Sequence, residues 1–519
     1  MDRDVPEAAV SPAAAAGFLD RLDAWAARTP DAVALSEPGT DITYAELGEL
    51  ISAAAAQLAR AGMKPADRVA LVADNSSAYL VCAFAVWKAG GVLATVYPSL
   101  ASDELTHCLG SADPVLVVAD ERVSGAVRRA APAGIPVIGL DLRLTVEHVG
   151  PATEATPAEV AGELALLCFT SGSTSAPKAV MHSLAGLTAA ATAFADVWHM
   201  SRDDSTIVCL PMAWAFGLVT TSMTTLLCGG TVLPLARTRP ELLIAAIAER
   251  KATFLAGVTT MFTKLVEYLG GLPELPEMSS LRLCVSGGEP RNERSFGIWQ
   301  SMTGIAVHDN YAASECFPVV TYDPLADPVP RLGSSGTVIE GAHMRIVDPD
   351  GREVEPGRAG EALWRGPALM LGYWRNPELT ADALTADGWY RTSDLVRVDA
   401  EGYVYVEGRL SSMIIRGGSN VSPAEVETVL AAHASVRQVA VIGVDDDLYG
   451  QQVVAVVVPV DSDRFDADDL LAHCRARLAG YKVPTRVVCV ADELPRHPAT
   501  GKVDRKRLTG RVQTSRSTS

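Results

Sequence analysis

The chain lacks the features that mark several large classes of protein. Its nine cysteines form no C-x-x-C pair and no Cys/His ligand spacing, so neither a zinc site nor a disulfide framework is indicated. Free thiols indicate a reducing compartment. No apolar run approaches the length of a membrane span, and the residues after Met1 do not have the layout of a signal peptide. We therefore expect a cytoplasmic protein without a membrane span.

Positive charge is also scarce. The chain has 44 Lys and Arg against 62 Asp and Glu, a formal net charge of −18, and no basic stripe offsets this balance. Nucleic acid is therefore not an expected partner. A hydrophobic content of 48% with 20% charged residues is ordinary for a globular enzyme, and 519 residues predict two or three domains. The oligomeric state stays open.

A polar stretch directly follows an apolar run typical of a buried strand. After residues 164–169, the chain reads Thr-Ser-Gly-Ser-Thr-Ser-Ala-Pro-Lys over residues 170–178. Hydroxyl groups, free backbone N–H groups and an ammonium group at the end of a flexible turn suit a polyphosphate. The stretch differs from the phosphate loop of kinases and GTPases, because the second glycine beside the lysine is missing. Taken alone, it also fits an ordinary polar surface loop.

Strands and helices alternate on both sides of this stretch. The apolar pattern predicts strands at 68–72, 92–96, 115–119, 205–209, 253–256 and 281–285, with helices between them. Val/Leu/Ala-rich strands separated by helices indicate a parallel sheet that is covered on both faces. Ligands of such sheets lie at the carboxyl ends of the strands, so residues 170–178, 210–217 and 286–290 should converge at one edge.

The C-terminal third has a different pattern. Short strands and turns predict a β subdomain over about 319–409, and an N-cap at Ser422 with Pro423 and Glu425 opens a further small unit. We expect an α/β fold: a large N-terminal body of α/β layers (1–409), a small mobile α+β C-terminal domain (410–508), and a disordered tail (509–519).

Five motifs occur in order along the chain. They are residues 170–178, Asn-Tyr-Ala-Ala-Ser-Glu at 310–315, Tyr-Arg-Thr-Ser-Asp at 390–394, Gly-Arg at 408–409, and Pro-Ala-Thr-Gly-Lys at 498–502. Together they resemble the adenylate-forming superfamily of acyl-CoA synthetases, carrier-protein adenylation domains and luciferases, over about residues 18–508. The resemblance implies an AMP-forming acid–thiol ligase, which joins a carboxylate to the α-phosphate of ATP, releases pyrophosphate and passes the acyl group to a thiol.

The resemblance also implies roles for individual residues. Those matching the ATP site are Thr170, Ser171, Gly172, Ser173, Thr174 and Lys178 at the β- and γ-phosphates, Gly287, Gly288, Glu289, Asn310 and the stacking Tyr311 at the adenine, and Asp394 and Arg409 at the ribose. Those matching the catalytic centre are Lys502 between the carboxylate and the α-phosphate, Ser314 at the α-phosphate, and Glu315 with Thr170 at Mg²⁺, an ion that prefers oxygen ligands. Ser411 matches the hinge.

The acid and its acceptor are less closely defined. The residues expected to line the acyl pocket are apolar: Trp214, Phe216, Leu218, Ala312 and Ala313. Ala215 stands where relatives that activate α-amino acids carry an aspartate, and an unpaired ammonium group in an apolar pocket is costly. We therefore expect a small neutral aliphatic or aromatic carboxylic acid.

Coenzyme A is the expected acceptor. Gly417 and Gly418 match the glycines along which the pantetheine arm passes, and Lys482 matches a position near the CoA nucleotide. The alternative is a stand-alone enzyme that loads the phosphopantetheine of an acyl carrier protein. A non-catalytic nucleotide-binding relative is disfavoured, because binding alone does not require Lys502. The implied cofactors and cosubstrates are ATP, Mg²⁺ and coenzyme A.

Six positions depart from the family pattern. Trp214 stands where the aromatic gate is often histidine, and Asn310 and Ala312 stand where the motif around Tyr311 usually has glycines. Ser175 and Ala179 replace glycines of the phosphate loop, and a non-glycine residue is strained wherever φ must be positive. Ser411 replaces an Asp or Lys at the hinge. We expect the two loop changes to alter loop closure and to leave adenylation intact. We interpret Ser411 as a variant hinge, because a small residue can still absorb the rotation.

Overall fold

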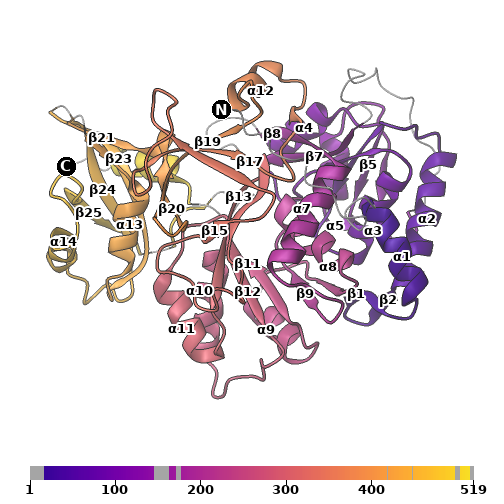
Figure 1. The fold of residues 1–519 in the computed structure, drawn as a ribbon, viewed down its shortest axis with the longest axis horizontal. Coiled ribbons are helices and arrows are strands. Elements are labelled where there is room, and N and C mark those ends of the chain that lie inside the picture. Colours follow the sequence, from indigo (N-terminus) through magenta and orange to yellow (C-terminus); the bar gives the residue numbers. More distant parts are fainter. Residues whose placement is uncertain are drawn as a thin grey trace, which may run out of the picture.

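We analysed a computed structural model of the chain. It describes residues 17–144, 163–170, 177–417, 419–446, 448–491, 493–496 and 503–514. In this part of the chain, no helix is long and apolar enough to cross a membrane. The elements form four sheets, and Figure 1 shows the two large sheets of the N-terminal body with the C-terminal sheet at the opposite end of the long axis.

The first sheet has seven strands. In spatial order they are β18 (Gly372–Tyr373), β8 (Lys178–Ser183), β7 (Leu164–Thr170), β4 (Val92–Thr95), β3 (Arg68–Val72), β5 (Leu116–Ala119) and β6 (Val137–Gly139). Strands β7, β4, β3, β5 and β6 are parallel, as expected, but β8 pairs antiparallel with both β7 and β18. The predicted phosphate stretch therefore connects two antiparallel neighbours.

Helices α3 (Ser77–Lys88), α4 (Ser102–Ala112) and α5 (Glu121–Ala130) contact strands of this sheet, and α2 (Tyr44–Arg60) packs against α3. A capping box begins α2, because the Thr43 side chain accepts from the Glu46 N–H and the Glu46 carboxylate accepts from the Thr43 N–H. Helix α3 is apolar on all sides and almost wholly buried, as is typical of a helix inside a large core.

The second sheet has nine strands. In spatial order they are β15 (Thr337–Val338), β14 (Cys316–Thr321), β13 (Val307–Ala313), β12 (Leu283–Gly287), β11 (Phe254–Gly257), β9 (Ser205–Val208), β10 (Thr231–Pro234), β1 (Val33–Glu37) and β2 (Thr40–Thr43). The central strands from β13 to β1 are parallel, and antiparallel strands close both edges.

The helices of this half are α1 (Phe18–Arg28), α7 (Leu184–Val197), the π-helix η1 (Phe216–Met223), α8 (Thr224–Leu227), α9 (Pro240–Ala248), α10 (Thr259–Gly270) and α11 (Glu293–Thr303). The largest hydrophobic core contains side chains of both sheets, among them Leu71, Leu166 and Phe254, and Phe194 of α7 lies in the same core. The two sheets and α7 therefore form one packed unit.

The β subdomain is a four-stranded antiparallel sheet with the order β16 (His343–Val347), β17 (Gly360–Arg365), β19 (Tyr390–Val398) and β20 (Val404–Arg409), accompanied by α12 (Pro377–Ala383). A short 3₁₀ turn, η2 (Leu410–Ser412), follows β20. The hinge predicted at Ser411 lies in this turn and stays a prediction.

The C-terminal sheet follows this turn. Its order is β22 (Ser419–Val421), β21 (Ile414–Arg416), β24 (Gly450–Pro459) and β23 (Val436–Asp446), and β25 (Arg486–Cys489) also pairs with β24. Its helices are α13 (Pro423–Ala431), α14 (Ala467–Arg475) and α15 (Arg505–Thr514). The fold class is thus confirmed: a large α/β body with a β subdomain and a small α+β C-terminal domain (Figure 1).

One expectation about the C-terminus is wrong. Residues 509–514, predicted as part of a disordered tail, belong to α15, whereas 515–519 lie outside the described residues. Leu508 and Val512 lie one helical turn apart and are 1% and 4% exposed, packed in one cluster with Ala440 and Val454. This apolar pair anchors a helix whose remaining residues are mostly polar, which is why its sequence resembles a tail.

Candidate active site

The ends of the predicted phosphate loop are held by a strand pair. Thr170 at the end of β7 lies opposite Lys178 at the start of β8, and the Thr170 hydroxyl donates to the Lys178 carbonyl across 3.5 Å. The predicted phosphate ligands at 171–174 and the departure at Ser175 lie outside the described residues. Ala179 pairs with Phe169 inside the regular ladder, so the strain expected for a non-glycine residue at position 179 is absent.

Glu315 lies at the tip of a tight hairpin. Ala313 of β13 pairs with Cys316 of β14, so only Ser314 and Glu315 form the connection. His182 Nε2 lies 2.7 Å from the Ser314 carbonyl, and the Met370 N–H donates to the Glu315 carbonyl across 2.8 Å. Because a carbonyl only accepts, His182 Nε2 carries the proton. Both predicted catalytic residues of the tip are therefore held by hydrogen bonds to their backbone.

The predicted ribose residues meet in one cluster. Asp394 of β19 lies directly opposite Arg409 of β20, and Arg409 Nε donates to Asp394 Oδ1 across 3.0 Å. Tyr311 of β13 donates its hydroxyl to Asp394 Oδ2 across 2.7 Å. Burial, together with the Asp394 charge, raises the pKa of the Tyr311 hydroxyl well above its ordinary value. Three residues predicted from three separate motifs thus contact one another.

Tyr390 connects this cluster with Glu315. Burial is the main cause of the raised pKa of its hydroxyl, and the charge of Glu315, the neighbouring Tyr373 and the charge of Asp394 raise it further. The charges of Glu315, predicted to bind metal, and Asp394, predicted to bind ribose, therefore both raise the pKa of the Tyr390 hydroxyl. This side chain belongs to the predicted 390–394 motif, although no role was predicted for it.

The segment predicted to lie along the adenine is crowded by the protein itself. A side chain at Gly287 would approach the Asn310 carbonyl to 2.8 Å and the Phe216 ring to 3.1 Å, so only glycine fits. Gly288 has a φ of +78°, which also favours glycine. The Asn310 side chain is 5% exposed, and among the described residues its amide oxygen has no hydrogen-bond partner. Such an atom is costly to bury unless a ligand donates to it.

Trp214, which is predicted to line the acyl pocket, lies in a loop whose start is held by hydrogen bonds to a buried side chain. Its ring lies 5.7 Å from the ring of Tyr97. The buried Asn75 amide donates to the carbonyls of Val208, Leu210 and Leu235, and Asn75 Oδ1 accepts from the Met212 N–H. Asn75 therefore joins the carboxyl ends of β9 and β10 to the start of this loop.

The other predicted pocket residues are divided between two cores. Leu218 is 1% exposed in the largest core, and Phe216 and Ala312 pack against it, whereas Ala313 packs against the core of the β subdomain. These residues lie at the junction of the nine-stranded sheet with η1 and the β subdomain. Their role as an acyl pocket stays a prediction.

The C-terminal domain contacts the body at the predicted adenine segment. Arg496 Nη1 lies 3.3 Å from Glu289 Oε1, and Glu289 Oε2 also accepts from the Thr260 N–H across 2.9 Å. Arg496 and Val503 form an antiparallel bridge. Lys502 itself lies outside the described residues, but Val503 is its chain neighbour. The bridge therefore places Val503, the chain neighbour of the predicted catalytic lysine, beside Arg496, which contacts the body.

The residues predicted to meet CoA lie in the C-terminal domain. Gly417 has a φ of +57°, and its N–H donates to the Tyr449 carbonyl across 2.7 Å. The Lys482 ammonium group donates to both carboxylate oxygens of Glu425 at 2.7 Å, so a ligand would have to share it with this partner. Gly418 lies outside the described residues. These assignments stay predictions.

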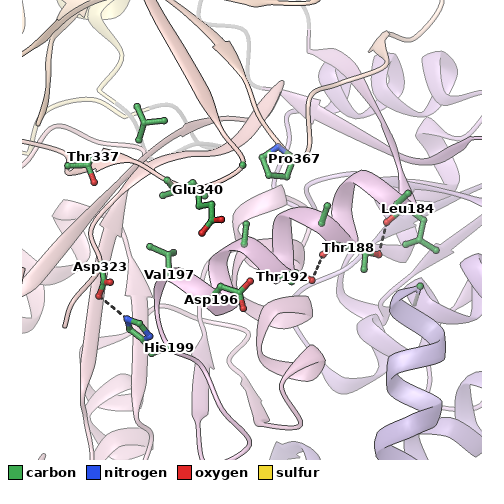
Figure 2. A pocket seen from close by; sticks show the side chains of 17 residues that line it. Leu184, Thr188, Thr192, Asp196, Val197, His199, Asp323, Thr337, Glu340 and Pro367 are labelled. Atoms are coloured by element: carbon green, nitrogen blue, oxygen red, sulfur yellow. Dashed lines mark hydrogen bonds and ion pairs between the residues drawn. The ribbon is translucent and has the colours of Figure 1, made fainter. Parts of the chain in front are cut away.

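A cleft of about 850 Å³ lies elsewhere, along α7 (Figure 2). Small and apolar side chains of α7 line it together with residues 337–341, and its lining residues include three carboxylates, Asp196, Asp323 and Glu340. Among the residues that the structure describes, none of the predicted ATP, acyl or CoA sites lines this cleft. It is therefore separate from the candidate active site.

Comparison with known proteins gives the same assignment as the motifs. Residues 22–374 match the model of the AMP-binding enzyme family, and residues 425–502 match that of the AMP-binding enzyme C-terminal domain. The chain belongs to the AMP-binding enzyme family. The expected membership of the adenylate-forming superfamily is thereby confirmed.

Relatives of this AMP-binding enzyme include named CoA ligases. It is 36% identical to a feruloyl-CoA synthase from Amycolatopsis sp over 91% of this chain and 96% of the relative. It is 32% identical to an indoleacetate–CoA ligase from Aromatoleum aromaticum over 93% and 95%. Among solved structures, ATP-bound MatB from Rhodopseudomonas palustris has a TM-score of 0.83 at 30% identity and covers 95% of this chain and 99% of its own.

The described residues fit the nucleotide and the metal ion that the family implies. The unpartnered Asn310 amide oxygen suits an amino group such as that of adenine. Glu315 Oε1 accepts one hydrogen bond, from Tyr373, which leaves Oε2 without a hydrogen bond among the described residues. Carboxylate oxygen is the ligand type that Mg²⁺ prefers. The donor set is therefore appropriate for ATP with Mg²⁺.

Proposed function

We propose that this protein activates a carboxylic acid with ATP and transfers the acyl group to coenzyme A. The observation that carries the proposal is the convergence of the motifs. Tyr311, Asp394 and Arg409 contact one another, and Tyr390 lies within the field of both Glu315 and Asp394. The named CoA ligases that match nearly the full length of the chain support the same activity.

The first step needs stabilisation of negative charge. A carboxylate oxygen of the acid attacks the α-phosphorus, the bond to pyrophosphate breaks, and charge develops on the phosphorus oxygens. We assign Lys178 to the β- and γ-phosphates and Lys502 to the α-phosphate, because each ends a motif that places an ammonium group there in this family. Bound Mg²⁺ would neutralise phosphate charge beside Glu315. Asp394, with two acceptor oxygens, suits the two ribose hydroxyls.

In the second step the thiol of CoA attacks the acyl carbonyl, and AMP leaves. Gly417 and Gly418 are assigned to the pantetheine arm and Lys482 to the CoA nucleotide. ATP and CoA are cytoplasmic substrates, and all nine cysteines are free thiols, which supports the expected cytoplasmic location. The alternative acceptor is the phosphopantetheine of an acyl carrier protein, which would receive the same adenylate.

The acid is proposed to be neutral and aromatic or aliphatic. Trp214 and Phe216 offer aromatic walls, and Ala215 provides no carboxylate for an α-ammonium group. The names of the feruloyl-CoA synthase and the indoleacetate–CoA ligase refer to aromatic acids, which favours the aromatic class for a first panel.

The test is ATP–pyrophosphate exchange with a panel of carboxylic acids, followed by product analysis with CoA and with carrier proteins. We expect exchange with at least one aromatic or aliphatic acid and formation of its CoA thioester. Exchange followed by acylation of carrier protein alone would select the alternative acceptor. If no acid supports exchange, the enzyme assignment is wrong.

A further inference from the structure

Tyr373 lies between the predicted metal ligand and the predicted phosphate-binding lysine, and neither motif contains it. Its hydroxyl donates to Glu315 Oε1 across 2.8 Å. The Lys178 ammonium nitrogen lies 5.4 Å from the centre of its ring, within the range of a cation–π contact. One side chain therefore contacts both charged groups through two different parts of its surface.

The backbone of Tyr373 is held firmly against the strand that carries Lys178. Strand β18 pairs with β8, so that Tyr373 lies opposite Val180, and its N–H donates to the Thr380 hydroxyl across 2.9 Å. A side chain at Gly372 would approach the Thr380 methyl group to 2.7 Å, at a φ of +134°. Tyr373 is 6% exposed. The ring thus has little freedom to move away from its two charged partners.

Lys178 and Glu315 have opposite charges, yet among the described residues neither forms an ion pair within 4.0 Å. A direct pair between them would compete with phosphate for the ammonium group and with metal for the carboxylate. The Tyr373 hydroxyl takes one carboxylate oxygen of Glu315, and its ring takes the ammonium group of Lys178. Each charged group is held while part of it stays available to a ligand.

We propose that Tyr373 is a positioning residue that orients Glu315 for Mg²⁺ and keeps Lys178 apart from it, so that the metal–ATP complex finds both groups in place. The proposal rests on the proposed function for the identity of the ligand. It requires no chemistry of Tyr373 itself, because the part of the hydroxyl is to donate a hydrogen bond to Glu315.

The test compares Tyr373→Phe with Tyr403→Phe. Tyr403 donates to Asp327 Oδ1 across 2.6 Å, so its phenylalanine variant also loses a bond from a tyrosine to a carboxylate, outside the site. The first readout is the binding of Mn²⁺ to the enzyme in the presence of a non-hydrolysable ATP analogue. The electron spin resonance signal of free Mn²⁺ measures this binding. The second is the Mg²⁺ concentration that gives half-maximal ATP–pyrophosphate exchange. Thermal unfolding of both variants without nucleotide reports on folding.

We expect Tyr373→Phe to weaken Mn²⁺ binding and to raise the half-maximal Mg²⁺ concentration about tenfold, as is usual when a partner of a metal ligand is removed. The ring remains, so the ATP KM at saturating Mg²⁺ should stay near the wild-type value. Tyr373→Leu, which also removes the ring, should raise that KM. Equal metal affinity in the wild type and Tyr373→Phe, or an equal loss in Tyr403→Phe, would overturn the proposal. Metal–nucleotide binding is measurable without any acid, so failure of the proposed function would be recognised separately.

Discussion

The Glu289 carboxylate and the Arg496 guanidinium group join the C-terminal domain to the body, with 3.3 Å between Oε1 and Nη1. The two side chains are only 10% and 23% exposed, so solvent screens the pair less than a surface ion pair. Arg496 is bridged to Val503, the residue that follows Lys502. We therefore propose that this contact is made during adenylation and is broken when the C-terminal domain turns for thioester formation.

Removing this contact should affect one half-reaction. We expect Arg496→Ala to lower ATP–pyrophosphate exchange about tenfold, which corresponds to the roughly 1.5 kcal/mol of a hydrogen bond to a charged group. Thioester formation from supplied acyl-adenylate should change little. Lys264→Ala is the control, because Lys264 forms an interdomain pair with Glu493 at 4.0 Å in which both side chains are more than half exposed. Equal losses in both half-reactions would contradict this role.

Lys502 should be needed for adenylation alone. We expect Lys502→Ala to lower exchange by about a hundredfold or more, since a cation aimed at the developing charge is lost. Conversion of supplied acyl-adenylate and CoA into the thioester should largely persist. Arg507→Ala, an exposed cation of the same domain, is the matched control and should leave both half-reactions unchanged. A comparable loss of both activities in Lys502→Ala would argue against a domain that works in two positions.

Asp394 should control the affinity for ATP. Asp394→Asn removes the negative charge to which Arg409 and Tyr311 donate hydrogen bonds. It also replaces one of the two carboxylate oxygens proposed to accept from the ribose hydroxyls. We expect the ATP KM to rise about tenfold, with a smaller change in the KM of the acid. Glu407→Gln provides the control, because Arg397 and Glu407 form a similar pair, at 3.1 Å, between the same two strands. If the acid KM rises as much as the ATP KM, Asp394 has another role.

Strand β3 and Asn75 illustrate how far the sequence predicts this structure. The apolar pattern predicted a strand at 68–72, the bounds that β3 has, because a run of buried apolar residues is a local signal. The motifs likewise predicted Tyr311, Asp394 and Arg409, which meet in space. Asn75 could not be recognised, because its partners lie more than 130 positions away along the chain and its role exists only once β9 and β10 are in place.

Tyr373 was missed for a related reason. It lies on a strand of two residues, too short to give any periodic pattern, and its partners Glu315 and Lys178 belong to distant motifs. The helix α15 was missed because two apolar side chains among charged ones are a weak signal until the sheet they cover is known. Local patterns thus predicted the elements and motifs, whereas contacts between distant segments needed the structure.

His182 provides a pH-dependent test of the hairpin tip. The side chain is 1% exposed, and burial lowers the pKa of its imidazole to about 4 from an ordinary 6.5, although the hydrogen bond with the Ser314 carbonyl opposes this shift. The native state therefore keeps His182 neutral, whereas the unfolded chain takes up a proton below pH 6.5. Above pH 6.5 the lowered pKa of His182 does not affect the free energy of unfolding. As the pH falls from 6.5 toward 4, it lowers that free energy progressively.

The amide N–H of His182→Gln can still donate to Ser314. As the pH is lowered from 7.5 to 5, we expect the free energy of unfolding of this variant to rise by about 2 kcal/mol relative to that of the wild type. Urea unfolding of both proteins at the two pH values measures this difference. At pH 7.5 the variant should retain most of the exchange activity, while His182→Leu, which cannot donate, should lose more of it. His343→Gln, at an exposed histidine, is the control for the replacement of a histidine by glutamine outside the site. A His182→Gln difference that stays constant, or that favours the wild type in acid, would mean that His182 is protonated in the folded protein.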